Sequence, residues 1–252
     1  MKFLLNVVFI FIYCLISFGC RSKPLQKNLY ISPKLYTKVD PFSENINDRL
    51  WFNKNIKHFN KVHINIEFAK KMPKGSLGEN ITSRALFYSK EDDLAYLKKY
   101  IHRSFKDAFL DSKYYQLVDN PSHDAINLNF YVVQIIRGKP VFGIFGTVMR
   151  CTPMGLLLIP VDLSINGLFD ESGGVIAMET LITDNNHRLL GVMVDRQKGT
   201  VALLNIKDFT TYGHIRANID NWSENIVTIF DTIKENKPYT FEPINTFKII
   251  DF

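Results

Sequence analysis

Residues 61 to 136 change their hydrophobic period twice, and this change limits the folds available to the chain. Apolar and polar residues alternate in KVHINIEFA (61–69) and again in AINLNFYVVQII (125–136), which predicts two half-buried strands. Between them, apolar residues recur every three or four positions, as in an amphipathic helix: Leu94, Leu97, Ile101, Phe105, Ala108 and Phe109. We therefore predict a strand–helix–strand unit whose strands, if they are neighbours, pair in parallel through a right-handed crossover.

The second half of the chain predicts a hairpin and a closing helix. VIAMETLIT (175–183) and RLLGVMVD (188–195) are typical of strands, and the turn residues Asp184 to His187 join them. In residues 218–236 one apolar stripe faces inward: Trp222, Ile226, Ile229, Phe230 and Ile233. The tail from Tyr239 is either a last edge strand or a packed arm. The predicted fold class is α+β: one mixed or antiparallel sheet with an early strand–helix–strand unit, a β-hairpin and a C-terminal helix packed on one face.

Composition indicates one domain with its own hydrophobic core. The chain has 252 residues, of which 46% are hydrophobic, and a formal net charge of +6 without any block of like charges. Such a surface favours anionic lipid or polymer, and we predict no nucleic-acid partner. The three cysteines are Cys14, Cys20 and Cys151. Cys14 lies in the apolar N-terminal leader, and if Cys20 is acylated, Cys151 has no partner, so we predict no disulfide framework.

The leader itself is typical of an exported protein. Residues 3–18 are apolar apart from Asn6 and Ser17, and Lys2 precedes them, as in a signal peptide. Gly19-Cys20 follows and resembles a bacterial lipobox, in which the cysteine is acylated and becomes the new first residue. The pattern departs from the lipobox at Ser17 and Phe18, where Leu and a small residue are usual. We predict lipidation, for example with palmitate, at Cys20; an uncleaved N-terminal membrane anchor and a cytosolic protein are the alternatives.

These features divide the chain into three parts. Arg21, rather than Asp, follows Cys20, and by resemblance to Gram-negative lipoproteins this favours the outer membrane, facing the periplasm; the inner membrane is the alternative. Prolines are frequent after the leader, as in a spacer, and Trp51 and Phe52 indicate that the end of this spacer docks on the domain. We predict a lipoprotein signal peptide at 1–19, a lipidated N-terminus and tether at 20–58, and a single α+β periplasmic domain at 59–252.

Residues 138–174 differ in composition from the rest. They hold seven of the thirteen glycines, and few charges. One interpretation is a buried hairpin or loop. The other is an apolar surface for an envelope protein partner or for lipid.

Motifs of catalysis are absent from the sequence. It contains no G-x-S-x-G, H-E-x-x-H or G-x-x-x-x-G-K-[ST] pattern, and we predict no catalytic residue, no metal site and no cofactor. Glu179 and Asp184 are candidates for paired carboxylates. The simpler interpretation places Glu179 on the solvated face of a strand and lets Asp184 bond its own turn. Asp195 and Arg196 are predicted to end a strand, in a salt bridge or turn contact rather than a phosphate site.

The stretch METLITDNNHRLLGVMVDRQKG (178–199) resembles a motif of an uncharacterised Gram-negative lipoprotein family, domain-of-unknown-function family 3313. In that family a strand with Glu leads to an Asp-containing turn, a second strand ends in Val-Asp-Arg-Arg or similar, and a Trp-bearing helix follows. The turn departs from the family's Ser/Thr-Gly pattern, having Asn-Asn-His-Arg. The positions that match, with no role implied for them, are Glu179, Asp184, Asp195, Arg196 and Trp222.

The resemblance implies a layout similar to small periplasmic domains of lipoproteins that assemble envelope machines. We therefore predict a membrane-anchored lipoprotein whose domain is non-enzymatic and serves binding or assembly in the cell envelope. The alternatives are an envelope hydrolase with a dispersed active site and a domain that binds lipid or a small ligand between sheet and helices. The sequence predicts neither the partner nor the oligomeric state.

Overall fold

The computed structural model describes residues 32–43, 45–70, 72, 90–136, 174–198, 204–205, 212–241 and 250–251. The predictions for Cys20, for Cys151 and for all but the last residue of 138–174 lie outside these residues. The described strands are β1 (Leu50–Phe52), β2 (Lys61–Phe68), β3 (Gln116–Val118), β4 (Ala125–Ile136), β5 (Val175–Thr183), β6 (Leu189–Lys198), β7 (Leu204–Asn205) and β8 (Ile250–Asp251). The helices are α2 (Lys90–Leu110) and α5 (Gly213–Lys234), with the 3₁₀ helices η1 (Pro33–Thr37), η2 (Ile46–Arg49) and η3 (Lys54–His58).

Six of these strands form one mixed sheet in the order β1-β6-β5-β4-β2-β3. The strands β2 and β4 lie side by side and parallel, as the periodicity predicts, with Ile64 opposite Leu128. The strands β4, β5 and β6 are antiparallel neighbours. This confirms the α+β fold class, to which the structure adds the short edge strand β3, parallel to β2.

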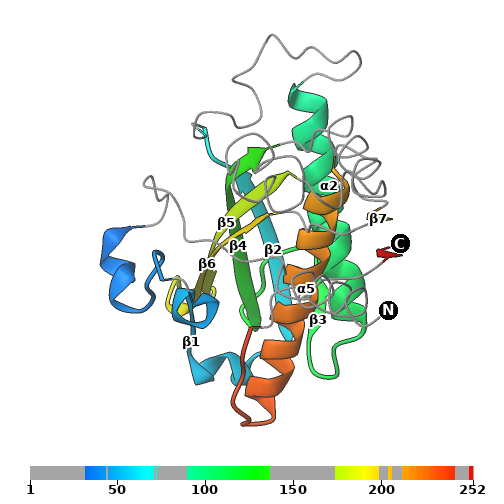
Figure 1. The fold of residues 1–252 in the computed structure, drawn as a ribbon. Helices are drawn as coiled ribbons and strands as arrows, with labels where there is room; N and C mark the ends of the chain where they lie inside the picture. The colour runs from blue at the N-terminus through cyan, green and yellow to red at the C-terminus, as the bar shows by residue number, and fades with distance from the viewer. Residues whose placement is uncertain are drawn as a thin grey trace, which may run out of the picture.

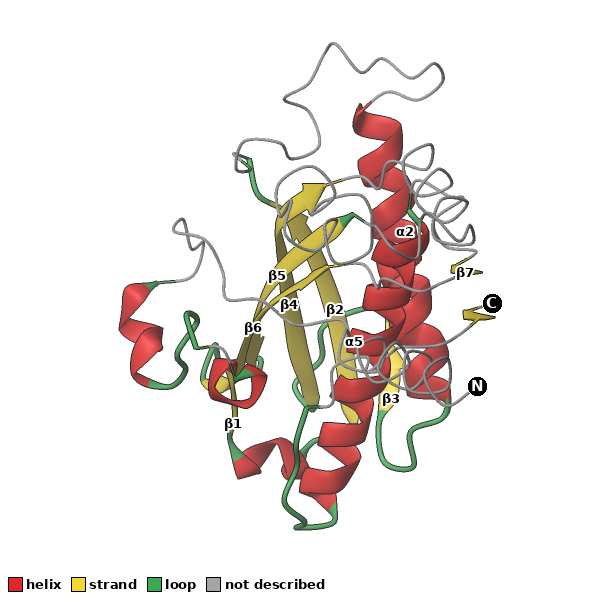
Figure 2. Cartoon of the chain, in the orientation of Figure 1, coloured by secondary structure: helices red, strands yellow, loops and turns green. Residues whose placement is uncertain are grey.

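Both long helices lie on one face of the sheet (Figures 1 and 2). The inward stripe of α2 includes Leu97, Ile101 and Phe105, each at most 1% exposed, and the ring of Phe105 lies 4.5 Å from that of Phe130 on β4. In α5, Trp222 and Phe230 are equally buried. Burial of aromatic side chains of this size contributes roughly 1.5–3 kcal/mol each, so the main core is the layer between sheet and helices.

A second, smaller apolar cluster lies on the opposite face. Its buried members are Val39, Val133, Ala177, Val192 and Val194, with Leu35 and Trp51 packed against them. Residues 33–43 therefore cover the side of the sheet that the helices leave free (Figure 1).

The predicted tether docks on the domain, as Trp51 and Phe52 indicate, and it does so over a longer stretch. Strand β1 pairs with β6, placing Phe52 opposite Gly191. Ile46 and Ile56, from η2 and η3, are also part of the main core. The folded unit thus includes residues on the N-terminal side of the boundary drawn at 58.

The other end of the domain also differs from the sequence prediction. Helix α5 begins at Gly213, five residues before the predicted start at 218, and its first turn is buried through His214 and Ile215. The tail forms a packed arm at Tyr239 and Phe241, which contact the main core. Strand β8 pairs with β7 rather than with the large sheet. None of the helices in the described ranges is long and apolar enough to cross a membrane.

Gly191 offers a test of the docking of β1. A Cβ atom at this position lies only 3.1 Å from side-chain atoms of Ile182 and Phe52 and 3.2 Å from the carbonyl oxygen of Trp51. We expect Gly191→Val to lower the free energy of unfolding by about 1–3 kcal/mol, because the larger side chain pushes β1 away from β6. Urea denaturation measures the loss. Leu189→Val, at the half-buried start of the same strand, is the control, and equal losses for both variants contradict the close approach.

Candidate functional site

The matching positions of the family motif fall at four places in the fold. Glu179 lies in the middle of β5, Asp184 in the turn after it, and Asp195 and Arg196 lie in β6. Trp222 lies in α5. The structure brings the side chains of Asp195 and Trp222 into contact. The side chains of Glu179 and Arg196 lie on the other face of the sheet, and that of Asp184 lies in the turn.

The Asp195 carboxylate is the centre of a buried polar cluster. The Trp222 indole Nε1 donates to Asp195 Oδ2 at 2.8 Å, and the Gln197 amide Nε2 donates to the same oxygen at 2.8 Å. Asp195 Oδ1 accepts from Arg49 Nη1 at 3.2 Å and from the backbone N–H of Arg196 at 2.8 Å. Arg49 and Asp195 are both fully buried, so this is an ion pair without solvent around it.

A different structural element places each member of this Asp195 cluster. Side chains alternate along β6, so Asp195 shares the helix-facing side with Met193, which belongs to the main core. Trp222 belongs to the apolar stripe of α5. Arg49 ends η2 and comes from 146 positions earlier in the chain. The cluster therefore joins the N-terminal segment, the hairpin and the C-terminal helix.

The chemistry of this cluster is structural. A carboxylate offers about four lone-pair directions, and four donors occupy those of Asp195. A general base needs a lone pair directed at its substrate, so this geometry suits a cross-link rather than proton transfer. The predicted salt bridge of Asp195 is confirmed, with Arg49 as a partner that sequence reasoning missed. The sequence around Arg49 carries no pattern that indicates this ion pair, because Arg49 lies in the segment predicted to be a tether.

Arg196 lies on the other face of the sheet. Its guanidinium Nε donates to Gln134 Oε1 on β4 at 3.0 Å, across the intervening strand β5. The prediction that Asp195 and Arg196 end a strand is wrong, because β6 continues to Lys198. The two neighbours therefore stabilise opposite sides of the hairpin, Asp195 toward the helices and Arg196 toward β4.

The prediction of a solvated Glu179 is also wrong. Its side chain is 0% exposed, since the face that it occupies carries the second apolar cluster of Ala177 and Val194 beneath residues 33–43. Asp184 lies five residues farther along the hairpin, about 16 Å at the usual rise of a strand. Glu179 and Asp184 are therefore not a pair of catalytic carboxylates.

Asp184 bonds its own turn, as predicted. Its Oδ1 accepts from the backbone N–H of Asn186 at 2.9 Å and of Arg188 at 2.8 Å, and its Oδ2 accepts from the Arg188 guanidinium Nε at 2.6 Å. His187 adopts a left-handed φ of 59° in this turn. Burial opposes ionisation of Asp184, but the donors of Arg188 and Asn186 outweigh it and hold its pKa below the ordinary 3.8.

A polar groove of about 310 Å³ lies on the outer side of the helix layer, between α2 and α5. At its base, Tyr100 Oη donates to Asp220 Oδ2 at 2.8 Å, and Ser104 Oγ donates to Asp220 Oδ1 at 2.7 Å. Burial and the neighbouring Asp220 carboxylate raise the pKa of Tyr100. These contacts tie the two helices together.

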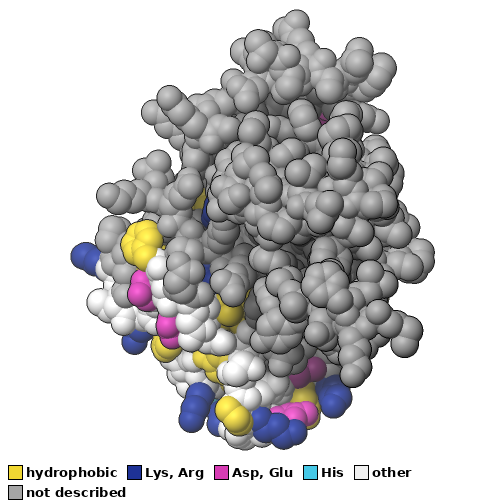
Figure 3. All heavy atoms as spheres, in the orientation of Figure 1, with side chains coloured by type: hydrophobic (Ala, Val, Ile, Leu, Met, Phe, Trp, Pro, Cys, Tyr) yellow, Lys and Arg dark blue, Asp and Glu magenta, His cyan; other side chains and the backbone are white. Residues whose placement is uncertain are grey.

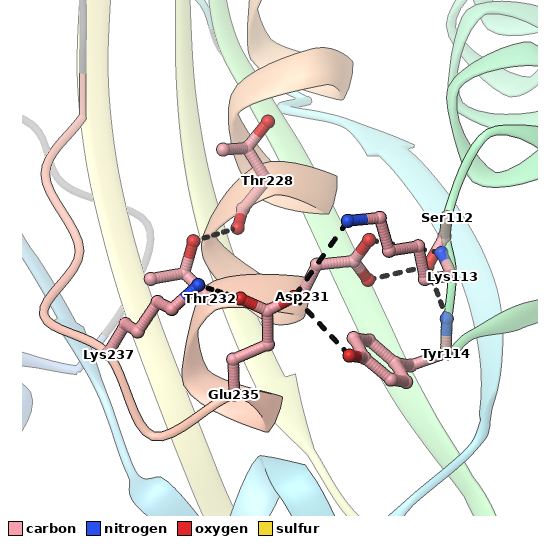
Figure 4. A network of polar contacts seen from close by, with 8 residues as sticks. All are labelled: Ser112, Lys113, Tyr114, Thr228, Asp231, Thr232, Glu235 and Lys237. Atoms are coloured by element: carbon pink, nitrogen blue, oxygen red, sulfur yellow. Dashed lines mark hydrogen bonds and ion pairs between the residues drawn. The ribbon is translucent and has the colours of Figure 1, made fainter.

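A further set of contacts fastens the lower end of α5 (Figure 4). Asp231 accepts from Ser112 Oγ at 2.7 Å and from the backbone N–H of Lys113 at 3.1 Å. Glu235 accepts from Tyr114 Oη at 3.3 Å and from Lys237 Nζ. The carboxylates of Asp231, in the last turns of α5, and of Glu235, its C-cap residue, thus hold the loop that follows α2. In the residues that the structure describes, no group of three or more His, Cys, Asp or Glu is arranged to hold a metal ion.

The Asp195 cluster yields a stability prediction. We expect Asp195→Asn to lower the free energy of unfolding by about 3–5 kcal/mol, because it removes the negative charge that Asp195 places beside the buried Arg49. The control is Asp107→Asn, which also removes one carboxylate but only from an exposed ion pair with Arg103 on α2, and which loses about 0.5 kcal/mol. Chemical denaturation followed by tryptophan fluorescence measures both. A smaller loss for Asp195→Asn than for the control contradicts the structural role.

Asp184 yields a pH prediction. Because its folded-state pKa lies below 3.8, its ionised form stabilises the native state above that pH, and the contribution disappears as the pH falls through the folded-state value. We expect Asp184→Asn to lower the free energy of unfolding by about 1–3 kcal/mol near neutral pH. The difference from the native chain shrinks below about pH 3.8. Thermal melts over a pH series measure it, and a difference that grows toward acid contradicts the argument.

Comparison with known proteins adds one match. The family model described as "Protein of unknown function (DUF3313)" matches residues 86–226. This range includes Glu179, Asp184, Asp195, Arg196 and Trp222 and leaves out Arg49. No curated protein and no solved structure matches the chain.

Proposed function

The chain belongs to this family of proteins of unknown function, and on that basis we propose that it is a bacterial lipoprotein, anchored by acyl chains on Cys20. Its α+β domain serves as a binding or assembly component of the cell envelope. In this proposal the protein resides in the outer membrane and faces the periplasm, and residues 138–174 provide contact with an envelope protein.

The hydrogen bonding of Asp195 is the observation that favours a binding function over a catalytic one. The most strongly bonded carboxylate of the family motif is fully buried, and its lone pairs are directed at protein donors. Asp184 is likewise engaged by its own turn. Because these polar residues of the motif maintain the fold, we propose that the domain is a scaffold that binds a partner through its surface.

The anchoring is supported by the leader. An apolar run of signal-peptide length ends at Gly19-Cys20, and the chain then continues with Arg21 and a proline-containing spacer. Two or three acyl chains, at about 0.8 kcal/mol per buried methylene, hold a protein on a membrane almost permanently. A connection of only eleven residues, 21–31, then joins Cys20 to the first described residue.

Palmitate labelling tests the proposal. We expect radiolabelled palmitate to enter the native protein, to be absent from Cys20→Ser, and to fractionate with the outer membrane. Cys14→Ser and Cys151→Ser are matched controls that keep the label, because neither thiol is the acylated one. A chain without label that retains its leader, as determined by mass spectrometry, overturns lipidation and indicates an uncleaved anchor.

A further inference from the structure

Residues 33–43 have an inward and an outward side. Leu35, Val39 and Pro41 are packed or buried against the sheet, and the backbone N–H of Asp40 donates to the carbonyl of Asp48 at 2.8 Å. The segment is therefore held in place rather than lying loosely on the domain. The residues four apart on its other side point away from the sheet and are exposed: Lys34, Lys38 and Phe42.

The outward side combines basic and aromatic groups. Phe42 is 50% exposed, which is unusual for a side chain of this size. The Lys38 ammonium lies 4.7 Å from the centre of the half-buried Trp51 ring. At this place in the fold, the space-filling view shows basic, acidic and hydrophobic side chains close to one another (Figure 3). Trp, Phe and Lys together are typical of surfaces that rest at a membrane–water boundary.

Two carboxylates of the described residues beside this surface, those of Asp40 and Asp48, form local hydrogen bonds. Asp40 Oδ1 accepts from the backbone N–H of Phe42 at 2.9 Å, and Asp48 Oδ2 accepts from Ser43 Oγ at 2.7 Å. These bonds orient the turn that carries Phe42. The lysine ammonium groups remain on the outward side, where anionic lipid attracts them.

The chain length limits how far this surface lies from the bilayer. Ser32, the first described residue, follows Cys20 by twelve positions, which span at most about 40 Å when fully extended. Three basic residues, Arg21, Lys23 and Lys27, lie in this interval and draw it toward anionic headgroups. A domain anchored at Cys20 therefore keeps residues 33–43 close to the membrane.

We infer that the surface formed by Lys34, Lys38, Phe42 and Trp51 rests on the lipid bilayer that carries the anchor. The inference depends on the anchoring proposed above and adds an orientation to it. The sheet face covered by residues 33–43 is turned toward the membrane, and α2 and α5 are turned away from it (Figure 1).

The chain has two tryptophans, and their positions make a direct test. Trp51 belongs to the proposed surface, whereas Trp222 is 1% exposed in the core. The full protein is purified from membranes and reconstituted into phosphatidylethanolamine–phosphatidylglycerol vesicles that contain phosphatidylcholine brominated near the top of its acyl chains. We expect the brominated lipid to quench the emission of the native protein and to leave that of Trp51→Phe unchanged.

A second pair of variants reports on the contact itself. In the Trp51→Phe background, Phe42→Trp places the reporter on the proposed surface. Tyr114→Trp places it on an exposed residue, 38% accessible, next to α5 on the other side of the domain. We expect strong quenching for Phe42→Trp and none for Tyr114→Trp.

Flotation of the same vesicles separates the two proposals. Protein that floats with the vesicles but is quenched equally at both reporters, or only at Tyr114→Trp, overturns the orientation and leaves the anchoring intact. Protein that does not float overturns the anchoring and the orientation together. Flotation with quenching confined to Trp51 and Phe42→Trp supports both.

Discussion

The contact between Asp195 and Arg49 determines how the distant parts of this chain meet. One carboxylate holds the guanidinium of the N-terminal segment and the indole of Trp222, which is the anchor of α5 in the core. The β1–β6 pairing and the packing of α5 on the sheet meet at this point. Without the Asp195 cluster, apolar surfaces on either side of β6 still attract one another, but little specifies which segment occupies which place.

A buried ion pair is a weak source of net stability, because removing two charges from water is expensive. Its value lies in specificity, since any other arrangement leaves an unpaired charge in the core. Here the Gln197 amide and the Arg196 backbone N–H also donate to the Asp195 carboxylate, so that four donors bind its two oxygens. Within the family motif, Asp195 and Trp222 are therefore the residues whose role the structure explains best, and that role is to specify the fold.

Much of the fold was accessible to reasoning on the sequence, because the signals of β2, α2, β4, β5 and β6 are local. Their apolar periods decide which side of each element is buried, and neighbouring elements follow from connection lengths. Strand β1 has three residues, too few to show a period, and it lay unmarked within a proline-containing segment. The early start of α5 was missed because Gly213 is a poor helix former and Tyr212 makes no side-chain cap.

The candidate site was less accessible, since its contacts depend on tertiary packing. Nothing near Arg49 in the sequence indicates that it becomes fully buried against a residue 146 positions away. Glu179 has the position of a solvent-facing residue in an alternating strand, and only the covering segment at residues 33–43 reverses this. Asp184 was predicted correctly because an Asp turn is a local structure.

The pairing of β1 with β6 has a consequence for the order in which the domain forms. A chain that emerges N-terminus first presents residues 46–58 long before residues 189–222 exist to receive them. Closing so long a loop is slow compared with forming the local helix and hairpin. The N-terminal segment must therefore wait, with Arg49 in water, and it enters the sheet last. The N-terminal stretch therefore completes the domain, and it can do so only after residues 189–222 have been made.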